Sequence, residues 1–267
     1  MINRKTMNKK FQTLYIIWYR EVLIYLRNSL KFFTSIFLPI LILIFLGTGL
    51  KTIFPTSVLH YDFAQFFFPG ILGLSISVMA ISSTMSIVWD REFGFLKEIL
   101  VSPISRSYIA LGKILGATTT ALLQGALILL TTPYLGINFD IPLFLKVMLV
   151  IFLIGYGMAA LGIFFASRLK RIESFSILSQ IIIAPMAFLS GAFFPLKNVP
   201  SWMITIAHCN PLAYSVDALR WVVLSKSLDY EEILLMTTHS LPICLTFLLA
   251  FNIIITFFSI RVFKKLK

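Results

Sequence analysis

Long hydrophobic stretches without ionised residues dominate this chain of 267 residues. Each stretch is long enough to cross a hydrocarbon core of about 30 Å as a helix, which requires about 20 residues. A soluble helical protein would need polar residues every few positions to keep one face of each helix in water, and these stretches lack them. The pattern predicts an all-α polytopic membrane protein. Its six predicted transmembrane helices are 32–50, 63–89, 114–136, 147–167, 174–194 and 241–260.

The basic residues predict the orientation of these helices. Of the 23 Lys and Arg residues, 18 lie before the first span, between the second and third, between the fourth and fifth, or after the sixth. By the positive-inside rule, both termini then face the cytoplasm or its organellar equivalent. Basic residues at membrane edges are attracted by anionic lipid headgroups, so the net charge of +12 requires no nucleic-acid partner.

Residues 11–31 combine a polar, basic side with an aromatic and aliphatic side. This pattern predicts an interfacial helix that lies on the membrane with its basic side toward the headgroups. A disordered basic leader is the alternative, and the density of aromatic residues argues against it. The basic side comprises Gln12, Thr13, Arg20, Arg27, Asn28 and Lys31, and the hydrophobic side Phe11, Leu14, Trp18, Val22 and Leu26.

Prolines and small residues mark local features within the spans. Pro39, Pro69 and Pro185 predict kinks, because each leaves a helix carbonyl without its usual partner. Gly112 and Gly116 would allow a neighbouring helix to approach closely, although this spacing is common in apolar sequence.

The outer segment, residues 195–232, is rich in helix-breaking and polar residues, so short re-entrant or interfacial helices are expected there instead of a simple crossing. Asn210-Pro211 predicts a turn before a helix over about 212–224. Asp217 and Arg220 are three residues apart on that helix and can pair; the alternative is a surface salt bridge of small value. Expected functional positions in this segment are Trp202, as an anchor at headgroup depth, and Asn210, Pro211, Tyr214, Asp217 and Arg220.

The loop between the second and third spans carries a second pattern. Residues 89–113 read WDREFGFLKEILVSPISRSYIALGK. Hydrophobic residues at three- and four-residue intervals predict a short amphipathic helix over 90–101, ended by Ser102-Pro103. Such a helix would dock into a groove of a soluble partner or rest on the lipid surface, and the spacing alone favours neither.

This loop resembles that of the ABC type-2 exporter permeases, whose pattern is approximately R-E-x-G-x-L-x-x-L-x-x-S-P followed by G-K. The matching residues are Arg91, Glu92, Gly94, Leu96, Ser102, Pro103, Gly112 and Lys113. A second block, residues 190–220, resembles the outer segment of the same family. Its matching residues are Gly191, Phe194, Pro195, Pro200, Trp202, Asn210, Pro211, Tyr214, Asp217 and Arg220.

The resemblance implies a permease that pairs with a second copy of itself and with two ATP-binding cassette subunits. The interfacial helix 11–31 and the coupling loop 90–103 would contact those ATPases, and ATP and magnesium would bind to the partner, with no cofactor on this chain. The subgroup similar to drug and nodulation-oligosaccharide exporters has this form without a fused ATPase. The implied coupling residues are Arg91, Glu92, Gly94, Leu96, Glu98, Ser102 and Pro103.

The residues themselves lead to a similar conclusion by elimination. No Asp or Glu lies inside any of the six spans, whereas ion-driven transporters usually place ionisable groups there. Gly112-Lys113 is followed by Ile114 and lacks the upstream glycine of a phosphate-binding loop. The chain is therefore expected to be a transport subunit and not an enzyme, with ATP hydrolysed by another chain.

Polar side chains inside the spans are candidates for a substrate pathway. Gln124 and Gln180 are the best of them, because an amide in lipid has more hydrogen-bonding groups to satisfy than a hydroxyl. The alternative is structural, since polar groups in membrane helices often bond to neighbouring helices.

Two other functions remain open at this stage. One is an integral membrane enzyme that acts on lipids, with His208, Asp217 and Arg220 gathered at the outer face, although nothing fixes a nucleophile beside the histidine. The other is a structural anchor for other proteins, which would not need kinked spans. A composition rich in Phe, Ile and Lys is compatible with a bacterial inner membrane or a plastid membrane.

Overall fold

Helices make up nearly all of the described part of this chain. The computed structural model describes residues 4–53, 63–96, 105–137, 140–196 and 199–266. The α-helices are α1 (Arg4–Arg27), α2 (Ser29–Ile53), α4 (Phe63–Ser83), α5 (Met85–Glu92), α7 (Arg106–Leu129), α8 (Ile141–Ala166), α9 (Ile172–Phe188), α10 (Ser201–Ala207), α11 (Pro211–Val223), α12 (Tyr230–Met236) and α13 (Leu241–Phe263). A short 3-10 helix, η1 (Thr132–Leu135), follows α7.

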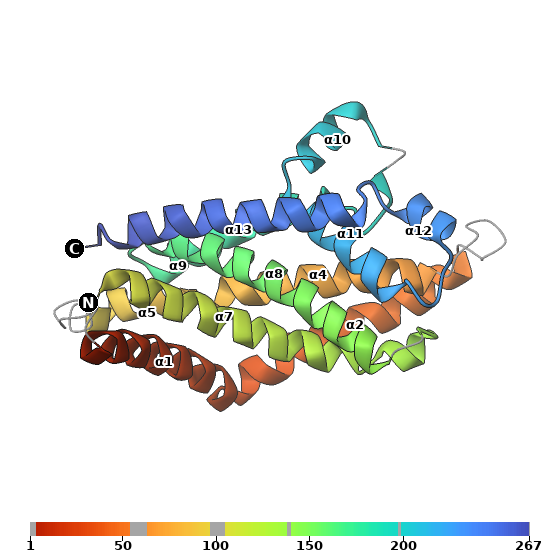
Figure 1. Cartoon of the computed structure of the whole chain (residues 1–267). Helices are drawn as coiled ribbons and strands as arrows, with labels where there is room; N and C mark the ends of the chain where they lie inside the picture. The colour runs from red at the N-terminus through yellow and green to blue at the C-terminus, as the bar shows by residue number, and fades with distance from the viewer. Residues whose placement is uncertain (1–3, 54–62, 97–104, 138–139, 197–198, 267) are drawn as a thin grey trace.

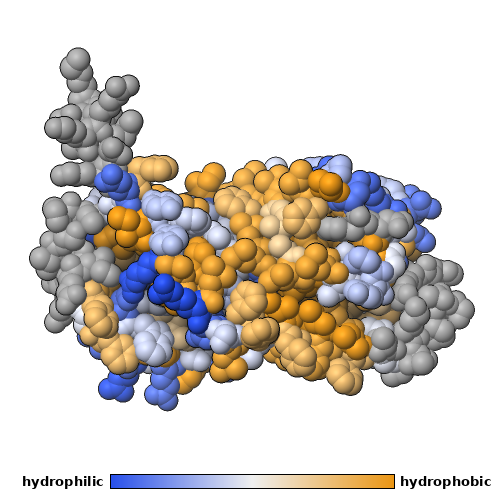
Figure 2. Space-filling view, turned by 90° about the horizontal axis from the view of Figure 1, so that it is seen from below, coloured by the Kyte–Doolittle hydropathy of each residue, from blue (hydrophilic) through white to orange (hydrophobic). Residues whose placement is uncertain are grey.

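The long helices α2, α4, α7, α8 and α13 lie side by side in an elongated bundle (Figure 1). Both termini lie at one end, together with α5 and the start of α9; we call this the terminal end. The opposite end carries η1 and α12. Hydrophobic side chains cover the middle of the face in Figure 2, and hydrophilic ones gather toward its two ends. This distribution is typical of a protein embedded in a bilayer.

In the described part of the chain, five helices are long and apolar enough to cross a membrane. They are Ser29–Gly47, Phe63–Glu92, Arg106–Leu129, Ile141–Ala166 and Leu241–Phe263. A sixth apolar helix, α9, has only 17 residues. The prediction of an all-α polytopic membrane protein is thus confirmed for the described residues.

The fifth predicted span, 174–194, is too long, because α9 ends at Phe188. The side-chain amide of Asn210 donates to the carbonyls of Met186, at 2.7 Å, and Leu189, at 3.0 Å. These bonds satisfy carbonyls that the end of the helix leaves without partners. Beyond them the chain turns at Gly191, whose φ of +75° suits glycine.

The prediction of one continuous helix over 90–101 is wrong at residues 93–94, and residues 97–101 lie outside the described part of the chain. Helix α5 ends at Glu92, and Gly94 has a φ of +84°, a left-handed conformation that a non-glycine residue adopts only with strain. The glycine therefore turns the chain where the hydrophobic spacing predicted a continuous helix. The predicted end of that helix, at Ser102-Pro103, lies outside the described residues.

Helix α11 follows Asn210, whose side-chain oxygen accepts from the backbone N–H of Leu212 at 3.0 Å. The helix packs against α4, α8 and α13 and is buried along most of its length, as a re-entrant segment would be.

Arg220 lies deep inside this packing. Its guanidinium donates to the carbonyls of Gly191, at 2.6 Å, and Met236, at 2.9 Å, and stacks over the ring of Phe66. Asp217 lies 3.8 Å away, and both side chains are buried. The interpretation of this pair as a surface salt bridge is therefore wrong, because the arginine connects three segments inside the bundle.

Helix α1 packs closely along α7 at two glycines. A Cβ on Gly112 would lie 3.0 Å from the Cβ of Ile17, and a Cβ on Gly116 would lie 2.5 Å from that of Glu21. Trp18 adds a hydrogen bond of 2.8 Å from its indole nitrogen to the hydroxyl of Thr119. The close helix approach expected at these glycines is confirmed.

We predict that Gly116→Ala weakens the attachment of α1. The new methyl group would lie closer to the Glu21 Cβ than real Cβ contacts allow, and overpacking typically costs about 1–3 kcal/mol. The measurement is the thermal unfolding midpoint in detergent. Gly49→Ala in α2 is the control, because a Cβ there meets no described atom within 4 Å. An equal or higher midpoint for Gly116→Ala than for Gly49→Ala would contradict the packing described here.

Candidate coupling site

A buried lysine connects three helices at the terminal end. Lys113 in α7 is almost fully buried, and its ammonium donates to the carboxylates of Glu21, at 2.9 Å, and Asp90, at 2.9 Å. The same ammonium donates to the hydroxyl of Ser86 at 3.1 Å. Since Glu21 belongs to α1 and Asp90 and Ser86 belong to α5, one side chain of α7 holds both neighbouring elements.

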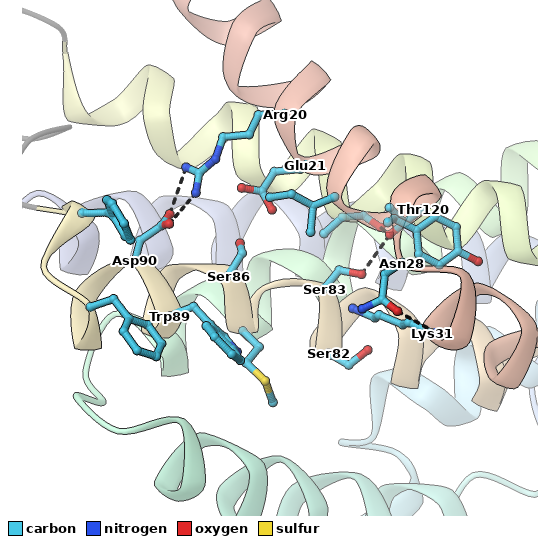
Figure 3. A pocket seen from close by; sticks show the side chains of 16 residues that line it. Arg20, Glu21, Asn28, Lys31, Ser82, Ser83, Ser86, Trp89, Asp90 and Thr120 are labelled. Atoms are coloured by element: carbon cyan, nitrogen blue, oxygen red, sulfur yellow. Dashed lines mark hydrogen bonds and ion pairs between the residues drawn. The ribbon is translucent and has the colours of Figure 1, made fainter.

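Arg20 completes this arrangement from α1. Its guanidinium pairs with both oxygens of Asp90 (Figure 3). The contact between Nη1 of Arg20 and Oδ2 of Asp90 is 3.1 Å long. The hydrogen bond to Asp90 raises the pKa of the Arg20 guanidinium. Arg20, Glu21, Asp90 and Lys113 form the charge cluster, in which two cations balance two anions. Buried charges are tolerated when they are paired in this way.

The charge cluster corrects the predicted role of the basic side of 11–31. Arg20 faces Asp90 and not the headgroups, and Thr13 of the same side is buried. Sequence reasoning missed Glu21 and placed Asp90 only at a span end. A signal was present, since an acid and a lysine flank neighbouring ends of two consecutive spans.

The two leading coupling residues attach α5 to the turn between α8 and α9. Arg91 donates to the carbonyls of Ser167, at 3.3 Å, and Leu169, at 3.1 Å. Glu92 accepts from the backbone N–H of Ile172, the first residue of α9, at 2.8 Å. A carboxylate at a helix N-terminus satisfies a free amide and favours the helix dipole. Both side chains therefore join parts of this chain to one another.

Of the remaining predicted coupling residues, the structure describes only Gly94 and Leu96. Gly94 is exposed and turns the chain, and Leu96 is buried against the core. Phe93 and Phe95, on either side of that glycine, are exposed. Glu98, Ser102 and Pro103 lie outside the described residues.

Most of the predicted outer-segment residues bind backbone groups of this chain or begin a helix. Trp202 is exposed, whereas Asn210 and Pro211 begin α11. The hydroxyl of Tyr214 donates to the carbonyl of His208 at 2.9 Å. Arg220 is occupied by backbone carbonyls. These contacts hold the outer segment against the bundle.

The structure brings together His208 and Asp217 through His239, a residue that sequence reasoning missed. Nδ1 of His239 lies 3.0 Å from the Asp217 carboxylate, and its Nε2 lies 2.9 Å from Nδ1 of His208. Asp217 also accepts from the backbone N–H groups of Thr238 and His239. In the described part of the chain, no hydroxyl or thiol is hydrogen-bonded to either imidazole, so the cluster lacks the activated nucleophile of a hydrolytic enzyme.

The two candidate pathway residues lie in different surroundings. Gln124 is buried in α7, and its amide donates to the carbonyl of Ser35 in α2 at 2.6 Å. Gln180 is exposed on α9. Their role in a pathway stays a prediction.

Comparison with known proteins places this arrangement in a family. The model of the ABC-2 type transporter family matches residues 12–224. The chain is 30% identical over 217 residues to a putative transport permease ycf38 of Cyanophora paradoxa, with 79% of this chain and 74% of the relative covered. It is 23% identical over 195 residues to the inner membrane transport permease YadH of Escherichia coli strain K12, with 73% of each chain covered.

A third relative extends this set. Nodulation protein J of Rhizobium leguminosarum bv. viciae is 27% identical over 213 residues, which cover 79% of this chain and 82% of the relative. The alternative of a lipid enzyme finds no support in these relatives. The chain belongs to the ABC-2 type transporter family and is the multi-pass membrane subunit, itself not an enzyme, of an ABC transporter that includes an ATP-binding cassette subunit.

Proposed function

We propose that this chain is the permease of an ATP-driven exporter, built from two copies of the chain and two cassette ATPase subunits. The charge cluster is the observation that carries the proposal. The family resemblance assigns ATPase docking to residues 11–31 and 90–103, and Lys113 binds a carboxylate in each of these segments, Glu21 in the first and Asp90 in the second. A displacement of either docking element is therefore transmitted directly to α7, inside the bundle.

A second connection leads from the docking loop to α9. Arg91 and Glu92 hold the turn that precedes this helix. A displacement of α5 would then be transmitted to α9 through the hydrogen bonds of Arg91 and Glu92. We assign Arg91 and Glu92 to transmission within the permease, and the exposed part of the loop around Gly94 to contact with the ATPase.

ATP and magnesium are assigned to the partner subunits in this proposal. The residues of this chain do not fit a nucleotide at Gly112-Lys113, because the lysine ammonium is already bound by Glu21 and Asp90. A phosphate-binding lysine must be free to reach the β- and γ-phosphates.

The positive-inside rule supports a cytoplasmic location for the terminal end. In this orientation α9 and the turn after it cross the membrane in addition to the five longer helices of the described residues. Helix α11 re-enters the membrane from the outer side. The names of the relatives favour a bacterial inner membrane or a plastid membrane. Outward transport is proposed from the family resemblance, and no substrate is assigned.

Exposed hydrophobic faces on α2 and α9 support pairing with a second copy. Only 17% of the α2 span is buried within one chain, and Ile177 and Ile181 of α9 are more than half exposed. Gln180 lies exposed between these two isoleucines in the sequence of α9. A polar side chain in lipid gains a hydrogen-bonding partner when a second helix packs against it.

We expect Gly94→Val to release the ATPase subunit during purification in mild detergent. A β-branched residue at φ +84° is strained, so the loop must change its course. Gly136→Val is the matched control, because Gly136 also follows a helix with positive φ, at +68°, but lies at the opposite end. The ratio of ATPase to permease is measured by mass spectrometry. Equal retention of ATPase by both variants would argue against docking at this loop.

We also expect Ile181→Cys to form a cross-linked dimer in native membranes. The background is Cys209→Ser, which removes the exposed native thiol and leaves the buried Cys244. A bismaleimide of short span is added, and the dimer is read on a denaturing gel. Leu149→Cys, equally exposed but on α8, is the control. Cross-linking through Leu149→Cys alone would place the second copy on a different face.

A further inference from the structure

A cavity of about 590 Å³ lies between α1 and the α4–α5 segment at the terminal end. Figure 3 shows polar side chains from both sides converging on it. Ile24, Met85, Trp89 and Phe93 form hydrophobic walls. The volume lies in the range of ordinary ligand sites, about 300–1,000 Å³. The cavity combines apolar walls with a few polar groups, and it borders both the charge cluster and the exposed loop around Gly94.

The charges that line this cavity do not cancel. Arg20, Glu21 and Asp90 contribute to its wall, and together with Lys113 they are neutral. Lys31 adds one further positive charge. Among the described residues, no acceptor is hydrogen-bonded to the Lys31 ammonium. The cavity therefore carries one positive charge in excess, held on a half-buried side chain near the start of an apolar span.

Hydrogen-bond donors in the wall of the same cavity point to an anionic ligand. The Asn28 side-chain oxygen accepts from the backbone N–H of Lys31 at 3.0 Å, which leaves the side-chain amide nitrogen of Asn28 to donate elsewhere. Ser86 accepts from Lys113, so its hydroxyl hydrogen is also available to a ligand. Both Asn28 and Lys31 stand at the N-terminus of α2, an end that favours negative charge.

The position of the cavity selects the kind of anion. Lys31 is the third residue of the first span, and Trp89 lies near the end of the second, so the site is at headgroup depth. A free inorganic anion would gain nothing from the hydrophobic wall of Ile24, Met85 and Trp89. An amphiphile with one negative charge would neutralise Lys31 and bury its tail against that wall.

We propose that this cavity binds a monoanionic phosphodiester lipid from the leaflet at the terminal end. Its phosphate lies between the Lys31 ammonium and the Asn28 amide, and its acyl chain follows the hydrophobic wall toward the bilayer. Since Arg20, Glu21 and Asp90 border the same cavity, the lipid lies next to the charge cluster.

The test is lipid binding by the purified full-length protein in a neutral detergent, followed by native mass spectrometry. The probes are dioleoylphosphatidylglycerol, which is anionic, dioleoylphosphatidylcholine, which has the same tails and no net charge, and glycerol 3-phosphate, which lacks tails. We expect the anionic lipid to bind most tightly. Lys31→Gln should weaken its binding about tenfold by removing the charged donor.

Two further variants keep the test specific. Arg27→Gln removes one charge from the C-terminal end of α1, four residues before Lys31. Arg27 is exposed and lies outside the cavity, so its substitution should weaken lipid binding less than about twofold. Ser82→Leu leaves every charge in place but narrows the cavity, and should weaken lipid binding as well. Unchanged unfolding midpoints without lipid show that each variant is folded.

The opposite results overturn the proposal. Equal weakening by Lys31→Gln and Arg27→Gln would mean that lipid binds only through the general surface charge. Equal binding of the two lipids would remove the role of the anion. Glycerol 3-phosphate binding as tightly as the anionic lipid would identify a site for free phosphate compounds and not for lipids.

Discussion

Burial of the Lys113 ammonium is the constraint on which the terminal end of this protein depends. An ammonium removed from water must be compensated by nearby carboxylates, and Glu21 and Asp90 supply them from two different helices. If α1 moved away alone, Lys113 would lose Glu21 and Asp90 would lose Arg20; if α5 moved away alone, Lys113 and Arg20 would both lose Asp90. The lysine therefore connects α1, α5 and α7, although α1 is not among the helices of the described residues that are long and apolar enough to span the membrane.

Close packing of the α1 and α7 backbones brings the charged side chains within reach of one another. Glycines on α7 let α1 approach until Gly116 lies against Glu21, one helical turn from the lysine. A larger residue there would hold the two helices apart. At the other edge of α5, Arg91 and Glu92 continue the connection to the turn before α9. The opposite end of the molecule uses a different solution, in which buried Arg220 is satisfied mainly by backbone carbonyls.

Much of the architecture could be predicted from the sequence, because the bilayer imposes a simple pattern. The hydrophobic stretches correspond to the long helices, and Asn210-Pro211 begins α11 as the turn chemistry predicts. Two boundaries failed for local reasons. The hydrophobic spacing continues through Gly94, but the backbone turns at this residue. Helix α9 ends earlier than predicted, where the side-chain amide of Asn210 donates to its last carbonyls.

The site itself was less predictable, because its contacts join distant positions. Lys113 is separated by 92 residues from Glu21 and by 23 from Asp90, so no local spacing reveals either pair. His239 was missed for the same reason, since it lies between α12 and α13, 22 residues after Asp217 and 31 residues after His208. Arg91 and Glu92 of the family motif follow Asp90 of the charge cluster directly, but the partners of their side chains are within this chain.

The most direct test of this account is a double-mutant cycle on Glu21 and Lys113. The free energy of unfolding is measured in mixed micelles for Glu21→Gln, Lys113→Met and the double variant, in all of which Arg20 and Asp90 remain paired. Removal of one partner of a buried ion pair costs about 3–5 kcal/mol, largely because the other charge is left uncompensated. The account predicts that the double variant loses less than the sum of the two single losses, by more than about 1 kcal/mol. Strictly additive losses would show that the two charges do not interact, and would contradict the claim that this pair joins α1 to the bundle.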